Sequence, residues 1–199
     1  MSQSLLIAFV VFAVVTLYTP GPNNVMLLAS GLNFGFRRTL PHIAGVTLGF
    51  AFMVAAMGAG FGVVFTTWPV LQTVLKYVGA AYLVYLAVAI ARAEPADPDE
   101  AARGQPMTFT AAALFQWVNV KGWVAIIGTI TAYAGIAKFP HNIVLQVLNF
   151  LLMGTASITT WTLFGSALRP FLTSPRLVQA FTIAMALLLL ASLYPVFME

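Results

Sequence analysis

The sequence contains no cysteine and very few charged residues. Without cysteine the chain has no disulfide, no thiolate nucleophile and no lipoprotein-type anchor, and its redox compartment cannot be inferred from this residue type. Charged side chains make up only 7% of the residues, against 61% hydrophobic residues and a mean hydropathy of +0.95. This composition is typical of an integral membrane protein and excludes a soluble globule.

The residue patterns of intramembrane enzymes and of ATP-driven pumps are also missing. The chain has two histidines, no H-E-x-x-H, no G-x-S-x-G and no P-loop. We therefore expect no catalytic residue, no metal and no cofactor, and any pumping must use an ion gradient or a partner's ATPase. The nine Lys and Arg residues are scattered singly or in pairs, which favours a role in membrane orientation over nucleic-acid binding.

Hydropathy predicts an all-α integral membrane protein with six transmembrane helices. At about 20 apolar residues per crossing, the 199 residues allow six spans and little else. Turn-forming residues separate the predicted spans at 33–41, 68–69, 138–141 and 169–176. The spans are predicted at residues 4–29, 40–66, 70–92, 109–134, 143–168 and 176–197.

The chain divides into two predicted three-helix halves, residues 1–92 and 109–199, joined by a polar linker at 93–108. Four of the five acidic residues lie in this linker. Lys and Arg gather in the first, third and fifth loops, which places both termini in the periplasm and inverts the second half relative to the first. The N-terminus has no basic segment, so we expect no cleavable signal peptide.

The first predicted span is interrupted by the segment Thr19-Pro20-Gly21-Pro22-Asn23-Asn24. Two prolines break the helical hydrogen bonding, and each unpaired backbone group in hydrocarbon costs several kcal/mol unless protein or a water-lined cavity satisfies it. Such discontinuous helices mark substrate pathways in transporters. The sequence therefore predicts a binding site at this break.

Lys121 is the only charged residue well inside a predicted span, and no Asp or Glu lies in any span. A lysine at the centre of a membrane helix costs about 2.5–3.5 kcal/mol, so it should face the interior or water. One interpretation is a lysine that extends to the membrane interface along its flexible stem. The other is a lysine whose countercharge is supplied by the carboxylate of a transported ligand, with Gln116 and Asn119 beside it.

These motifs resemble the LysE/RhtB superfamily of bacterial amino-acid exporters. The resemblance covers the whole chain and rests mainly on the first-span motif with the glycines that follow it, and to a lesser extent on residues 79–86 and 115–121, which are most similar to the cysteine/O-acetylserine exporter branch. One departure is Asn119-Val120-Lys121, where the family commonly has Asn-Pro-Lys. The chain thus lacks the proline that would enforce a second helix break, and Gly122 favours bending less strongly.

The resemblance implies a multi-pass carrier of the bacterial inner membrane that exports small neutral amino acids such as cysteine or O-acetylserine. Its expected partners are the amino-acid substrate, protons and membrane lipid, with no nucleic acid, and a homodimer is left open. The candidate substrate-binding residues are Thr19, Pro20, Gly21, Pro22, Asn23, Asn24, Gln116, Asn119 and Lys121.

Other functions and roles stay open at this point. A passive channel, a helical subunit of another complex and an intramembrane enzyme are the alternatives to a carrier. His42 lies at a predicted membrane edge, where exposure is favoured over a role as a proton relay. Gly45 and Gly49 form a G-x-x-x-G pair, which favours close helix packing. Further polar residues of the spans are expected to bond between helices or to line a path: Asn149, Thr155, Ser157, Thr159 and Thr160.

Overall fold

The computed structural model describes residues 3–92, 105–172 and 174–194, and within these ranges it is helical, with no strand. The predicted linker therefore lies largely outside the described residues, as does the end of the last predicted span. The elements in chain order are α1 (Gln3–Tyr18), α2 (Pro22–Ala56), the π-helical η1 (Met57–Phe61), α3 (Val63–Thr67), α4 (Pro69–Ala91), α6 (Phe109–Phe115), η2 (Gln116–Val118), α7 (Val120–Ala132), η3 (Ala134–Ile136), α8 (His141–Leu168), η4 (Arg169–Phe171) and α9 (Pro175–Ala191).

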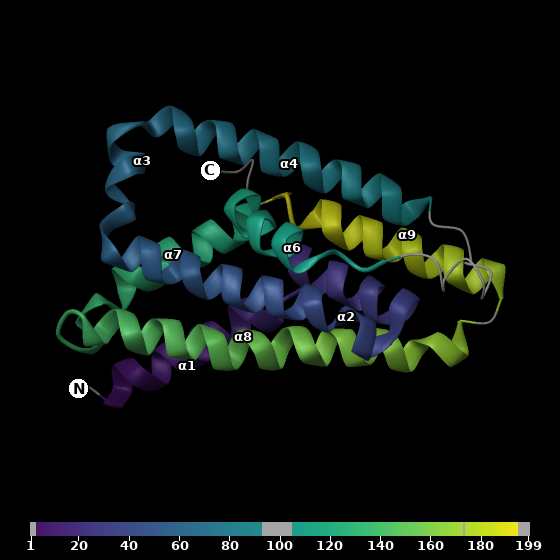
Figure 1. Ribbon diagram of the computed structural model, residues 1–199, viewed down its shortest axis with the longest axis horizontal. Coiled ribbons are helices and arrows are strands. Elements are labelled where there is room, and N and C mark those ends of the chain that lie inside the picture. The colour runs from purple at the N-terminus through teal and green to yellow at the C-terminus, as the bar shows by residue number, and fades with distance from the viewer. Residues whose placement is uncertain (1–2, 93–104, 173, 195–199) are drawn as a thin grey trace.

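The long helices pack lengthwise into a bundle (Figure 1). In Figure 1, α4 and α9 lie side by side along one edge, α8 runs along the opposite edge, and α2 lies between them. The short α3 crosses one end of the bundle and joins α2 to α4. Helices from the two predicted halves are thus neighbours throughout, while the division into halves stays a prediction.

The helix α2 is folded back on itself at Gly35. This glycine has φ 75° and ψ 168°, a conformation that L side chains rarely adopt. Ser30 Oγ lies 3.2 Å from Thr39 Oγ1, although nine residues of straight helix would separate them by about 13 Å. The two arms, residues 22–34 and 36–56, therefore reverse direction within the segment 33–41 that the sequence predicts as a turn.

Six membrane spans are not confirmed by helix length and apolar character alone. Among the described residues, three helices are long and apolar enough to cross a membrane, at Pro22–Phe61, Thr73–Ala91 and His141–Phe171. A fourth span results if the bent pair Phe109–Val118 and Val120–Ala132 counts as one crossing. The remaining apolar helices, Gln3–Tyr18 and Arg176–Ala191, are shorter than a full crossing.

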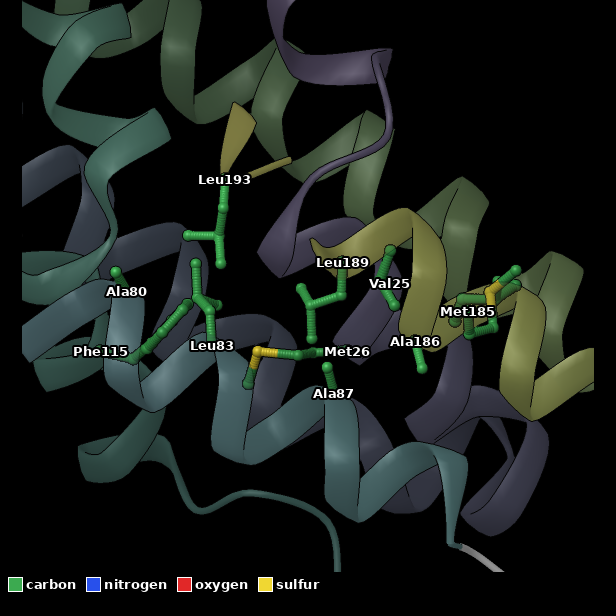
Figure 2. Packing of buried hydrophobic residues seen from close by; sticks show 11 residues of the cluster. Val25, Met26, Ala80, Leu83, Ala87, Phe115, Met185, Ala186, Leu189 and Leu193 are labelled. Atoms are coloured by element: carbon green, nitrogen blue, oxygen red, sulfur yellow. The ribbon is translucent and has the colours of Figure 1, made fainter. Parts of the chain in front are cut away.

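One hydrophobic cluster joins α2, α4, α6 and α9 (Figure 2). Figure 2 shows Phe115 of α6 beside Leu83 of α4, and Leu189 of α9 facing Met26 of α2. In a lipid environment such contacts stabilise mainly through close van der Waals packing, because lipid tails are as apolar as the side chains themselves. This cluster fixes α6, and with it the segment that leads to Lys121, against the first helices of the chain.

Gly45 and Gly49 let α2 approach α6 closely. A Cβ atom added at Gly45 would lie 2.4 Å from the carbonyl oxygen of Phe109, and one at Gly49 would lie 2.6 Å from Cα of Ala113. Both distances are far below van der Waals contact, so only glycine fits. The close packing predicted from the G-x-x-x-G pair is confirmed.

A second close approach, between α8 and the first arm of α2, gives a test of the fold. A Cβ at Gly165 would lie 2.1 Å from the carbonyl oxygen of Leu28, so we predict that Gly165→Ala forces the helices apart and lowers stability by about 1–3 kcal/mol. Thermal unfolding of the detergent-purified protein measures this. The control is Gly128→Ala, whose Cβ would meet only Phe12, at 3.9 Å. Equal melting temperatures for the two variants would contradict the prediction.

Candidate functional site

The first helix ends at Tyr18 and the chain restarts as a helix at Pro22, as the two prolines predict. Gly21 between them is extended, with φ −170° and ψ 179°. Proline has no N–H, so Pro20 and Pro22 cannot donate to the last carbonyls of α1. Pro22 itself occupies the first helical turn, where a missing N–H costs nothing.

Three side chains, those of Asn24, Ser157 and Lys121, donate to the backbone carbonyls that this break leaves without amide partners. Asn24 Nδ2 donates to Leu17 O at 2.7 Å and to Thr19 O at 3.0 Å. Ser157 Oγ, on α8, donates to Leu17 O at 2.8 Å. The break is therefore held open by polar groups in place of a continuous helical ladder.

Lys121, in the first turn of α7, supplies the remaining bonds. Its Nζ donates to Thr19 O at 2.7 Å and to Pro20 O at 3.2 Å. The side chain is half-buried, and no Asp or Glu occurs anywhere in the described residues. The ammonium thus points toward the first helix break, where it lies on backbone carbonyls 101 and 102 residues away in the chain.

A second break lies at Asn119, although proline is absent there. The helical segments Phe109–Val118 and Val120–Ala132 meet at 67°, and Asn119 has φ −81° and ψ 94°. Its Oδ1 accepts a hydrogen bond from Gly122 N at 3.3 Å, which caps the start of α7. Trp123 Nε1 donates to the carbonyl of Trp117 at 2.8 Å, on the other side of the bend. The chain thus bends at Asn119 with a side-chain cap and without a proline.

The two breaks are joined by a pair of side-chain amides. Asn23 Nδ2 donates to Gln116 Oε1 at 2.8 Å, and Gln116 Nε2 donates back to Asn23 Oδ1 at 3.2 Å. Gln116 is fully buried and also receives a bond from Asn119 Nδ2 at 3.4 Å. Both polar atoms of the Gln116 side chain therefore form hydrogen bonds that link the start of α2 to the bend before α7.

A small cavity of about 60 Å³ lies between α1, α2, α7 and α8 at these breaks. Its polar lining includes Asn23, Asn24, Asn119, Lys121 and Ser157, and Phe50 and Phe150 are part of its apolar lining. Such a volume holds a few water molecules, whereas small-molecule sites usually measure about 300–1,000 Å³. The site as it stands is therefore narrow, and we call this arrangement the closed state.

The structure brings the predicted site residues together. Gly21, Pro22, Asn23, Asn24, Asn119 and Lys121 line the cavity, Thr19 and Pro20 contribute the carbonyls that Lys121 binds, and Gln116 lies behind Asn23. Absent from the predicted set are Ser157, Thr47 and Phe50, which also line the cavity. Ser157 belongs to the group of polar span residues noted in the sequence, but nothing local distinguishes it from its neighbours.

His42 is buried, so the expectation that it is exposed at a membrane edge is wrong. Only 2% of its surface is exposed, and neither ring nitrogen has a hydrogen-bond partner among the described residues. The reversal at Gly35 begins the second arm of α2 earlier than hydropathy predicts, which places His42 about two turns inside the helix. In the described part of the chain no group of His, Asp and Glu gathers that could hold a metal ion.

Comparison with known proteins agrees with the resemblance noted in the motifs. Residues 14–193 match the family model described as LysE type translocator. Over 167 residues, 83% of this chain and 84% of the relative, the sequence is 35% identical to a cysteine/O-acetylserine efflux protein of Salmonella typhimurium strain LT2. A protein of the same description from Escherichia coli strain K12 is 36% identical over 122 residues, which is 61% of either chain. No solved structure matches the chain.

Asn24 provides a test of how the first break is held. We predict that Asn24→Ala lowers the melting temperature of the purified protein, because it removes the donor to two carbonyls at a buried position, a loss of about 1–3 kcal/mol. Asn142→Ala is the control, since Asn142 makes a single amide-to-carbonyl bond, to Ala134 O at 3.2 Å, outside the site. If the two variants have the same melting temperature, Asn24 does not hold the break.

Proposed function

Because the chain belongs to the LysE type translocator family, it is a transporter and not an enzyme, and we propose that it exports small neutral amino acids across the bacterial inner membrane. Cysteine and O-acetylserine are the first candidates, since a relative that aligns with most of the chain is described as an efflux protein for these two compounds. Export would use an ion gradient, with protons as the proposed coupling ion.

The observation that carries this proposal is Lys121 at the first helix break. Its charge lies in a cavity whose other polar groups are neutral amides, hydroxyls and backbone atoms, and no acidic residue of the described chain can neutralise it. A buried or half-buried ammonium is stabilised by a nearby carboxylate. The α-carboxylate of an amino acid supplies this countercharge, and Asn23 and Asn24 would contact the other polar groups of the substrate.

We further propose six crossings arranged as two inverted halves, with both termini periplasmic. The first crossing would comprise α1 and the first arm of α2, and the second crossing the second arm, because the chain reverses at Gly35. In each half the first crossing is the broken one, at 19–21 and at Asn119. Equivalent breaks in the two halves favour an inverted repeat with substrate between them. A homodimer stays a prediction.

The narrow cavity fits one state of a carrier that alternates its access. A carrier must pass through a state in which its site is closed, and here the site has room for only a few water molecules. Opening would require movement between the helices that surround the breaks. At the α2–α6 and α2–α8 crossings glycines place no side chain between the two helices. A channel would not concentrate its substrate against a gradient, so flux measurements distinguish the two.

Lys121→Met is expected to abolish export. The variant keeps most of the side-chain bulk but removes the charge that would bind the substrate carboxylate. Efflux of labelled cysteine and O-acetylserine from proteoliposomes under an imposed pH gradient measures the effect, and we expect a loss of at least about tenfold in rate. The control is Lys138→Met, at an exposed position in the turn before α8. Normal export by the Lys121 variant would remove this residue from the site.

His42 is the proposed proton carrier, with the substrate itself or Lys121 as the alternatives. Its ring is buried and unpartnered, and Pro41 next to it lines a hollow together with Arg37 and Arg38. Burial disfavours the charged ring, so His42 would bind a proton only in the part of a transport cycle that opens it to water.

His42→Gln should uncouple transport from the pH gradient. We expect the variant to exchange labelled for unlabelled amino acid across the membrane, as the wild-type protein does, but to lose acceleration by the gradient. The matched control is His141→Gln, because His141 is exposed at the start of α8. An undiminished response to the gradient in His42→Gln would leave the substrate or Lys121 as the proton carrier.

A further inference from the structure

At the first break, the C-terminal end of α1 and the N-terminal end of α2 lie at the same small cavity. Backbone carbonyls at the C-terminal end of α1 carry partial negative charge, and amides at the N-terminus of α2 carry partial positive charge. Gly21, which precedes α2, has no side chain to cap those amides. A free amino acid has the same pattern of charge, with an ammonium and a carboxylate on one carbon atom.

The carbonyl end of this break already holds a primary ammonium, that of Lys121. Its Nζ lies 2.7 Å from Thr19 O and 3.2 Å from Pro20 O. The lysine reaches this position across Gly21, where an added Cβ would lie 2.7 Å from Cδ and 2.8 Å from Nζ of Lys121. The two carbonyls therefore form a site that accepts an ammonium group, and in the closed state the chain occupies it with its own side chain.

We propose that the α-ammonium of the substrate replaces the Lys121 ammonium on the carbonyl oxygens of Thr19 and Pro20, while Lys121 turns to bind the α-carboxylate of the same molecule. The inference rests on the proposed function, since it requires an amino acid to enter this cavity. One ammonium exchanges for another on the same acceptors, so the carbonyls stay satisfied. The released lysine gains an ion pair that it lacks in the closed state.

This exchange selects molecules that carry both charges. An amine without a carboxylate displaces Lys121 but leaves it without a counterion. A carboxylate without an amine draws Lys121 away and leaves the Pro20 carbonyl unpaired, at a cost of about 1–3 kcal/mol, while the Thr19 carbonyl keeps only its bond from Asn24. The site is thus specific for α-amino acid zwitterions. In the closed state Lys121 occupies the carbonyls, and the substrate must displace it.

A matched set of three thiols tests the exchange: cysteine, cysteamine, which lacks the carboxylate, and 3-mercaptopropionate, which lacks the amine. Binding of labelled cysteine and labelled cysteamine to the purified protein is measured under reducing conditions, with 3-mercaptopropionate as a competitor. For the wild-type protein we expect cysteine to bind at least about tenfold more tightly than either analogue.

The decisive comparison uses Lys121→Met. Removal of the lysine vacates the carbonyls and deletes the partner of the carboxylate, so cysteine should bind about tenfold more weakly and cysteamine about tenfold more tightly than to the wild-type protein. Lys138→Met should leave both affinities unchanged. A variant that loses cysteine and cysteamine equally would overturn the assignment of the carbonyls as the ammonium site.

Two further measurements keep the result decisive. If Lys121→Met does not fold, Lys121→Gln retains a donor for one carbonyl without the charge, and the ratio of cysteamine to cysteine affinity should rise in the same direction. Export by the wild-type protein is measured in parallel in proteoliposomes. Absence of amino-acid export would reject the proposed function itself, whereas export with an unchanged affinity ratio would reject only the exchange on the carbonyls.

Discussion

The contact between the Lys121 ammonium and the carbonyls of Thr19 and Pro20 is the interaction on which the arrangement of helices around the end of α1 depends. A helix broken by two prolines inside an apolar bundle leaves carbonyls without amide partners, and hydrocarbon supplies none. Lys121 from α7, Asn24 from α2 and Ser157 from α8 meet this requirement together. Satisfying the break therefore fixes the positions of three helices around the end of α1.

The same polar groups line the cavity, so the bonds that stabilise the break also shape the proposed substrate site. Groups that only stabilised the break would be fully paired and closed to a ligand. Here Lys121 bonds to neutral carbonyls and has no carboxylate partner in the described residues, so a substrate with opposite charge can compete for it. The amide pair of Asn23 and Gln116 links this break to the bend at Asn119.

Local chemistry made the first break and its lysine predictable. Proline lacks an N–H wherever it occurs, and a lone charge in an apolar run stands out in one dimension. The bend at Asn119 was less predictable, because Val120 gives no local signal and the bend depends on a side-chain cap and on Trp123 reaching the Trp117 carbonyl. His42 was expected to be exposed but is buried, because hydropathy places helix boundaries without reference to the reversal at Gly35.

The sequence by itself determined the membrane setting, the family, the broken first helix and the candidate residues at that break, since these follow from composition, from proline chemistry and from motifs that are close in the chain. Tertiary structure decided which distant groups meet: Lys121 with Thr19, Asn23 with Gln116, and Ser157 with Leu17. Each of these pairs spans between 93 and 140 residues of chain. Their approach depends on helix crossings at small residues and on packing between helices that are distant in the chain, which no local pattern encodes.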